Sequence, residues 1–139
     1  ELDTVTSVYG RLDSISEIAR QLPNLRIHVE HTGMPNINGE HILALAKHPN
    51  VFVKFTVSGL KGISKQSYPH KDAQPFFEKV YGLFGPKRIM WGSNYPPVLS
   101  EEGYEKTMLF LQKEIPYLSA EDKEWLMGKT ALEMWRFRG

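Results

Sequence analysis

The stretch VFVKFTV, residues Val51–Val57, limits the fold of this chain more than any other segment. β-Branched and aromatic residues fill it, and only Lys54 and Thr56 are polar. These residue types favour strands. A strand that is apolar on both sides is typical of a parallel sheet with helices over its faces. We therefore expect Val51–Val57 to be buried on both faces within a parallel sheet.

Two further strands are predicted on either side of this run. Residues 25–31, LRIHVEH, alternate between apolar and polar side chains, as a half-buried strand does. Residues 88–91 form a third, short apolar run. The spacing of apolar residues predicts helices at 13–22, 39–47, 72–84, 102–113, 120–127 and 130–137, with a loop at 58–71. This alternation predicts an α/β fold with parallel strands, either a barrel or a doubly wound sheet.

Two serines mark helix starts in this pattern. Ser14 with Glu17, and Ser119 with Asp122, have the spacing of a capping box, in which each side chain bonds the other residue's backbone N–H. We therefore expect helices to begin just after both serines.

Composition narrows the class of protein. The chain has 139 residues, which suits a single domain or half of a larger one, and its net charge of +1 gives no sign of a nucleic-acid or membrane partner. It has no cysteine, so disulfides, thiolate catalysis and cysteine metal ligands are excluded. The absence of cysteine favours a reducing compartment, and we expect a cytoplasmic protein. The first residue is Glu1 rather than methionine, and we expect further sequence upstream.

Candidate site residues follow from the position of each predicted strand end. In parallel α/β folds the chemistry lies at the carboxyl ends of the strands. His31 ends the first predicted strand and can act as a general acid or base. Lys54 lies within the second and either binds an anion inside a barrel or extends between the sheet and its helices.

The third strand ends in Ser93, Asn94 and Tyr95, followed by Pro96 and Pro97. Asn94 cannot act as a base and offers a metal only a neutral carbonyl oxygen. It is either a site residue or a turn asparagine.

The other histidines are weaker candidates. His28 and His31 are three residues apart, which on a strand puts them on opposite faces and makes them poor joint metal ligands. His41, His48 and His70 fall in loops or at helix ends, where we expect solvent exposure or helix capping.

Four segments resemble the amidohydrolase-related proteins, the amidohydrolase 2 group of metal-dependent hydrolases. They are IHVEHTG, PNVFVKFTVSGL, FGPKRIMWGSNYPPV and YLSAEDKEWLMGKTALEMWRF, in the same order as in the family. The resemblance covers about residues 20–137. It implies that residues 1–139 are the C-terminal half of a (β/α)₈ TIM barrel, from about the fifth helix to the closing helices, with the three predicted strands as the sixth to eighth.

The resemblance also implies roles for individual residues. His31 matches the sixth-strand histidine, an acid/base group that contacts substrate or water. Asn94 matches the eighth-strand aspartate, which activates water and helps to bind a metal where one is present. Lys54 matches a seventh-strand lysine. We expect His31 and Asn94 to be catalytic and Lys54, Ser93 and Tyr95 to bind substrate, and we assign no metal ligand in this chain.

The leading hypothesis is a hydrolase of a small carboxylated or cyclic substrate, such as a lactone or amide, with His31 as acid/base. One alternative is a non-oxidative decarboxylase of the same superfamily. Another is a catalytically inactive barrel fragment, because Asn94 replaces the usual aspartate and the family's first-strand histidine pair is absent from the chain. A divalent metal such as zinc is an expectation for the full-length protein. The expected partners are a small-molecule substrate and either further copies of the chain or the remaining half-barrel, because an open sheet exposes its edges.

Overall fold

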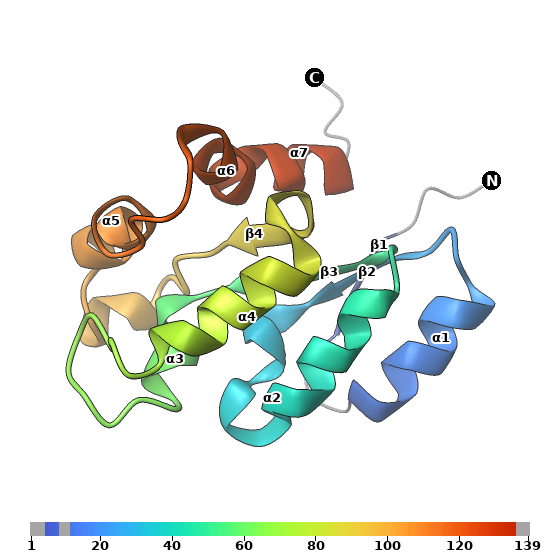
Figure 1. Cartoon of the computed structure of the whole chain (residues 1–139), viewed down its shortest axis with the longest axis horizontal. Coiled ribbons are helices and arrows are strands. Elements are labelled where there is room, and N and C mark those ends of the chain that lie inside the picture. The colour runs from blue at the N-terminus through green and yellow to red at the C-terminus, as the bar shows by residue number, and fades with distance from the viewer. Residues whose placement is uncertain (1–4, 9–11, 136–139) are drawn as a thin grey trace.

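The computed structural model describes residues 5–8 and 12–135, with side chains for all of these except 5–8, 13, 35–38 and 40. Within this part the sheet has four parallel strands in the order β1-β2-β3-β4 (Figure 1). They are β1 Val5–Val8, β2 Arg26–Val29, β3 Val51–Phe55 and β4 Ile89–Trp91. The prediction of parallel strands alternating with helices is confirmed. The prediction of three strands is wrong, because β1 precedes the first helix.

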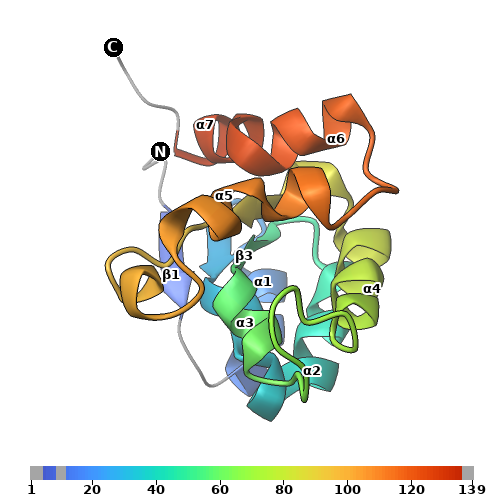
Figure 2. The same cartoon turned by 90° about the vertical axis from the view of Figure 1, so that its left-hand side faces the viewer.

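Helices follow each strand. They are α1 Ile15–Gln21, α2 Pro35–Ala44, α3 Val57–Lys61, α4 Gln74–Phe84, α5 Tyr104–Lys113, α6 Ala120–Glu124 and α7 Thr130–Trp135. A π-helical turn, Trp125–Lys129, joins α6 to α7. In the view of Figure 2 the helices surround the strands, with α1 to α3 below them, α4 to the right and α5 to α7 above. Among the described residues, no helix is long and apolar enough to cross a lipid bilayer.

The strands have one packed face, which we call the outer face. Its side chains are fully buried against the helices; they are Ile27, Val29, Val51, Val53 and Phe55. Phe55 contacts Phe77 of α4, with ring centroids 4.3 Å apart, and lies 6.0 Å from the ring of Phe110 in α5. These contacts make the outer face the centre of the hydrophobic core.

The opposite, inner face is less packed. In β3 every second residue is buried, and Phe52 and Lys54 between them stay partly exposed. The prediction that this segment is buried on both faces is therefore wrong. Its apolar composition comes from the outer face and from Phe52, while Thr56 and Val57 already belong to the next helix.

Several predicted boundaries differ from the structure. α2 begins at Pro35 rather than at residue 39, because a proline suits the first helical turn. Residues predicted as a loop form α3, whose first turn is capped by Thr56: its Oγ1 accepts the Gly59 N–H at 3.3 Å. The capping box of Ser119 and Asp122 is confirmed.

The capping box predicted for Ser14 and Glu17 is wrong. Ser14 makes no capping bond at α1, and the Glu17 carboxylate instead accepts hydrogen bonds from Arg20 and Gln21. The Glu17 carboxylate therefore bonds side chains one turn further along the helix instead of the Ser14 backbone N–H.

Two polar side chains tie helix ends together beneath the strands. Asn50 is buried, and its Nδ2 donates to the carbonyls of Ala19, Leu22 and Leu25. The Arg88 guanidinium donates to four carbonyls, those of Phe84, Leu83, Ala46 and His48. Each side chain satisfies carbonyls that a helix leaves without a partner at its C-terminus.

Candidate active site

The carboxyl ends of β2, β3 and β4 lie at the same end of the sheet. Val29 pairs with Val53, and Val53 pairs with Ile89, so the three strands end close to each other. Just beyond them, the Gly92 N–H donates to the Phe55 carbonyl at 2.9 Å. The predicted site residues that follow these strands are therefore carried on neighbouring segments, which we call the mouth.

His31 lies just past the end of β2 rather than within it. The strand stops at Val29, and His31 has a left-handed backbone with φ 49°. Its prediction as the last strand residue is wrong, because the chain turns sharply at Glu30–Gly33. His31 Nδ1 is 3.1 Å from Thr56 Oγ1, at the end of β3. The half-buried imidazole is thereby held against the neighbouring segment.

The turn after His31 is strained. Thr32 also has a positive φ, 52°, which β-branched residues rarely adopt. Its hydroxyl donates to the Lys54 carbonyl at 3.3 Å, so the strained residue is fastened to β3. Gly33 has φ 70°, and a Cβ there would lie 2.6 Å from Leu12 Cδ1. Strained backbone of this kind gathers at functional sites.

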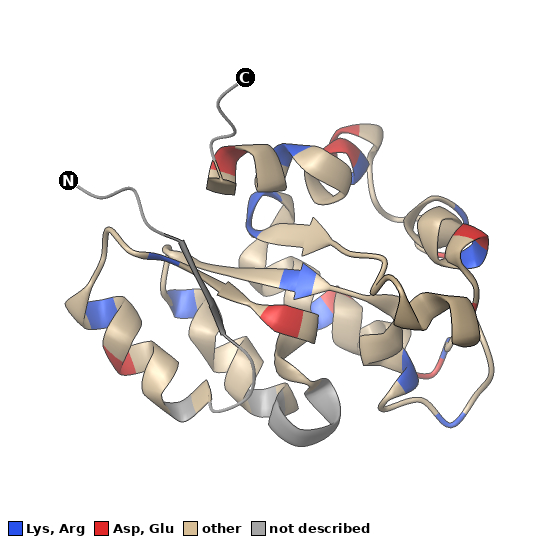
Figure 3. Ribbon diagram, turned by 180° about the vertical axis from the view of Figure 1, so that it is seen from behind, with Lys and Arg blue, Asp and Glu red and all other residues tan. Residues whose placement is uncertain are grey.

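Lys54 lies on the inner face and forms an ion pair with Glu30. The two side chains are 25% and 22% exposed, so this charge pair is only partly open to water. Its stem lies against Gly92, where an added Cβ would be 2.8 Å from Lys54 Cδ. Lys54 therefore lies on the face opposite the packed outer face, and its role in binding an anion stays a prediction. Few charged residues other than these lie on the strands (Figure 3).

Glu30 is a residue that sequence reasoning did not select. The signal was available, because Glu30 falls on the polar face of the predicted strand 25–31 and its charge is opposite to that of Lys54 on the next predicted strand. Thr56 and Ser58 were also missed; their hydroxyl oxygens are 3.0 Å apart, and Thr56 also contacts His31. Thr56 was assigned to the interior of a strand, which concealed its role as a helix cap.

The inner face also carries His28, directly below this ion pair. It is 3% exposed, lies edge-on to Trp135 at 5.2 Å, and its Nδ1 is 3.7 Å from Glu30 Oε1. Burial lowers the pKa of His28, and nearby Lys54 and His31 lower it further against the opposing effect of Glu30. Burial also lowers the pKa of His31, with Lys54 as the next contribution. Both imidazoles are therefore neutral near pH 7.

The segment after β4 carries the remaining predicted residues. Asn94 has φ 59°, a conformation that asparagine tolerates better than most residues. Its carbonyl accepts the Val98 N–H at 3.0 Å, and Ser93 Oγ accepts the Tyr95 N–H at 3.3 Å. The Tyr95 side chain is 65% exposed. Ser93 and Asn94 thus lie at the mouth, while Tyr95 projects into solvent.

One histidine departs from its prediction. His70 was expected to be exposed or to cap a helix, but it is 2% exposed, inside the connection between α3 and α4. Its Nδ1 is 2.9 Å from the Gln66 carbonyl. The loop composition around it gave no sign of this burial.

The described residues do not form a metal centre on their own. No group of three or more histidine, aspartate or glutamate side chains among them is arranged to hold a metal ion. At the mouth, His31 Nδ1 lies against Thr56, Glu30 pairs with Lys54, and Asn94 carries no charge. We therefore derive no step through a metal.

Comparison with known proteins supports the family resemblance. A family model described as amidohydrolase matches residues 4–137. An L-fucono-1,5-lactonase from Burkholderia ambifaria is 34% identical over 95 residues, covering 61% of this chain and 31% of that protein. The chain thus spans less than half the length of this curated relative.

Solved structures show the same fold. A zinc-bound amidohydrolase from Burkholderia multivorans superposes with a TM-score of 0.79 at 20% identity, over 96% of this chain and 53% of that one. A 2-pyrone-4,6-dicarboxylic acid hydrolase from Pseudomonas putida gives 0.69 at 23% identity, over 96% and 52%. The matches span about half of each solved chain, in agreement with the predicted half of a (β/α)₈ barrel. Its limits within a complete barrel stay a prediction.

Proposed function

This chain belongs to the amidohydrolase family, and from that premise we propose that it carries part of the active site of a hydrolase for small lactones. The named relative is an L-fucono-1,5-lactonase, and a solved neighbour is assigned as a 2-pyrone-4,6-dicarboxylic acid hydrolase. Both names denote a cyclic ester as substrate. The observation that carries the proposal is His31, a neutral imidazole held at the mouth by Thr56.

His31 acts as the acid/base group in this proposal. A base must be unprotonated near the working pH and fixed in orientation. The lowered pKa meets the first condition and the contact with Thr56 meets the second. As water adds to the lactone carbonyl, its proton passes to the imidazole. When the ring C–O bond breaks, the imidazolium returns a proton to the leaving oxygen, and the product is a hydroxy acid.

Lys54 and the segment after β4 bind the substrate. Lys54 supplies the positive charge on the inner face, which suits a carboxylate on the substrate or the developing oxyanion. Glu30 partners Lys54 and holds its ammonium at the mouth. Asn94 donates an amide N–H rather than abstracting a proton, and Ser93 and Tyr95 contribute further polar contacts.

Assays of L-fucono-1,5-lactone and 2-pyrone-4,6-dicarboxylate hydrolysis test the proposal. The rate is measured from the acid that hydrolysis releases. We expect His31→Gln to lower kcat by about 100-fold or more, the range of general acid–base catalysis. His41→Gln, at an exposed position of α2, is the matched control and should retain the rate. Equal rates for the wild type and His31→Gln would remove His31 from the mechanism.

The variant Asn94→Asp distinguishes the hypothesis of an active enzyme from that of an inactive barrel. If Asn94 already works as a donor, the aspartate should slow hydrolysis. If the chain is inactive because it lacks the family's acid, only Asn94→Asp should hydrolyse the lactones. Metal analysis of the same two proteins shows whether the complete protein takes up a divalent ion, as the zinc-bound neighbour does.

The decarboxylase alternative makes a different product. It predicts release of carbon dioxide from an aromatic acid without uptake of water, which the acid-release assay does not register.

Association is a separate proposal: β1 and β4 form the two edges of the described sheet, and pairing with further chain, of the same or another half-barrel, would cover them. Gel filtration measures this state directly.

A further inference from the structure

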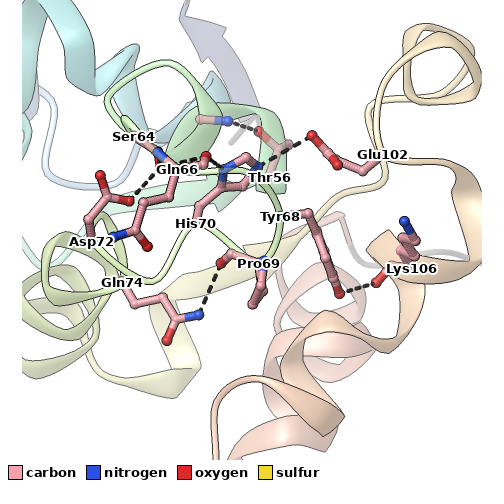
Figure 4. A network of polar contacts seen from close by, with 11 residues as sticks. Thr56, Ser64, Gln66, Tyr68, Pro69, His70, Asp72, Gln74, Glu102 and Lys106 are labelled. Atoms are coloured by element: carbon pink, nitrogen blue, oxygen red, sulfur yellow. Dashed lines mark hydrogen bonds and ion pairs between the residues drawn. The ribbon is translucent and has the colours of Figure 1, made fainter.

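The connection between α3 and α4 contains a buried histidine that the proposed mechanism does not use. The His70 side chain is 3% exposed, and its backbone has a left-handed φ of 54°. Its Nε2 lies 3.4 Å from Glu102 Oε1, close enough for an ion pair but not aligned for a hydrogen bond. Figure 4 shows His70 between its own loop and Glu102, which precedes α5.

Both ring nitrogens of His70 face oxygen acceptors. Nδ1 faces the Gln66 carbonyl and Nε2 faces the Glu102 carboxylate. The Glu102 side chain is only 18% exposed, so its carboxylate is partly enclosed where it meets the ring. The Tyr68 ring is a further neighbour of His70, with ring centroids 6.2 Å apart. The imidazole thus lies between its own loop and the segment that precedes α5.

The loop around His70 is stiffened on both sides. Asp72 accepts hydrogen bonds from Ser64 Oγ at 2.5 Å and from the Lys65 N–H at 2.7 Å. The Tyr68 hydroxyl donates to the Lys106 carbonyl in α5 at 3.0 Å. Gln74 donates to the Pro69 carbonyl (Figure 4). The loop thus forms a firm support against which Glu102 is held.

Backbone bonds connect Glu102 to Asn94. The Gly103 N–H donates to the Val98 carbonyl at 3.0 Å, and the Val98 N–H donates to the Asn94 carbonyl at 3.0 Å. Val98 is itself buried. Two backbone hydrogen bonds thus link the residue after Glu102 to Asn94.

The same connection begins at the residue that holds His31. Thr56 contacts His31 Nδ1 and caps α3, and the Ser64 N–H at the far end of α3 donates to the Leu60 carbonyl. The stretch from Thr56 to His70 thus has one end at His31 and the other at Glu102.

We propose that His70 is a positioning residue: its contact with Glu102 fastens the β4–α5 segment and holds Asn94 in register with His31. The catalytic consequence rests on the proposed lactone hydrolysis, whereas the fastening itself does not. A histidine that served only the fold of its own loop would leave the Asn94 segment unaffected.

Backbone hydrogen exchange measures the fastening without any substrate. In His70→Gln and in Glu102→Gln we expect the Val98 and Gly103 amides to exchange about tenfold faster, as expected for local opening. The Gly92 amide, bonded to Phe55, is the internal control and should keep its rate. His41→Gln should change none of the three. Unchanged exchange at Val98 in both variants, or equal acceleration at Gly92, would overturn the proposal.

Kinetics of the same variants test the catalytic part. We expect kcat to fall by about tenfold to 100-fold with little change in KM, since a misplacement near 1 Å has such an effect. The double variant should be no slower than either single variant. Faster exchange at Val98 with an unchanged kcat would refute positioning. If the wild type hydrolyses neither lactone, the proposed function fails, and exchange at Val98 alone still decides whether His70 fastens the segment.

Discussion

The two faces of the sheet differ in how they are built. The outer face is apolar and fully buried against helices, from Ile27 to Phe55. The inner face carries His28, Glu30 and Lys54, and the last two remain partly exposed. Burial of apolar area is the main source of stability in folded proteins. Stability therefore resides on the outer face, while the inner face and its mouth are available for chemistry.

The largest expected effect comes from breaking the outer face. Phe55→Ala should lower the free energy of unfolding by about 3–5 kcal/mol, since it leaves a cavity between Phe77 and Phe110. Phe52→Ala, three residues earlier on the partly exposed inner face, is the matched control and should cost about 1 kcal/mol. Urea unfolding measures both. Equal losses would mean that the two faces contribute alike.

A second effect lies at the helix ends that support the outer face. Arg88→Ala should cost about 2–3 kcal/mol, because it leaves four carbonyls without their charged donor. Burial lowers the pKa of Arg88, but the guanidinium stays charged at all working pH values. Arg88→Lys keeps the charge without the fork of donors, and it should recover less than half of the loss. Full recovery by lysine would show that charge alone matters.

The sequence predicted the outer face better than the mouth, for a physical reason. Apolar periodicity reports burial against helices, which is why Val51–Phe55 and α4 were found within a few residues. The mouth depends on contacts between distant segments. His31 and Thr56 are 25 residues apart, and His70 and Glu102 are 32 apart, and no local pattern reports either contact.

The same limit explains the errors in assignment. The turn at His31 and Thr32 uses positive φ values, which are uncommon for these residue types, and the predicted strand therefore ran on to His31. The four residues of β1, VTSV, include two polar residues side by side, so no apolar run marks them as a strand.

The pH dependence of stability should come mainly from the inner face. His28 has a pKa below its ordinary 6.5, so the unfolded chain binds a proton more readily than the folded chain. The contribution of His28 to the free energy of unfolding should therefore be constant well above pH 6.5, the ordinary value, and become less favourable as the pH drops below it. His28→Leu should flatten this slope, which urea unfolding between pH 5 and 8 measures.

The flattening need not be complete. His31 and His48 also have lowered pKa values, so part of the slope remains in the variant. A slope unaffected by His28→Leu would place the acid sensitivity outside the inner face.

The smallest expected effect on stability lies at the Glu30–Lys54 pair. This pair gives the strictest test of whether the outer face provides stability while the inner face provides chemistry. Partly exposed ion pairs contribute about 1 kcal/mol or less, so Glu30→Gln with Lys54→Met should leave the free energy of unfolding nearly unchanged. Lactone hydrolysis by the same double variant should be lost, because the charge that binds the substrate is gone. Lys54→Met alone should be somewhat less stable than the double variant, since it leaves Glu30 without its counter-ion on a half-buried surface. If the double variant lost more than about 2 kcal/mol of its free energy of unfolding, the ion pair would be a major contributor to stability. Stability would then depend on both faces of the sheet rather than on the outer face alone.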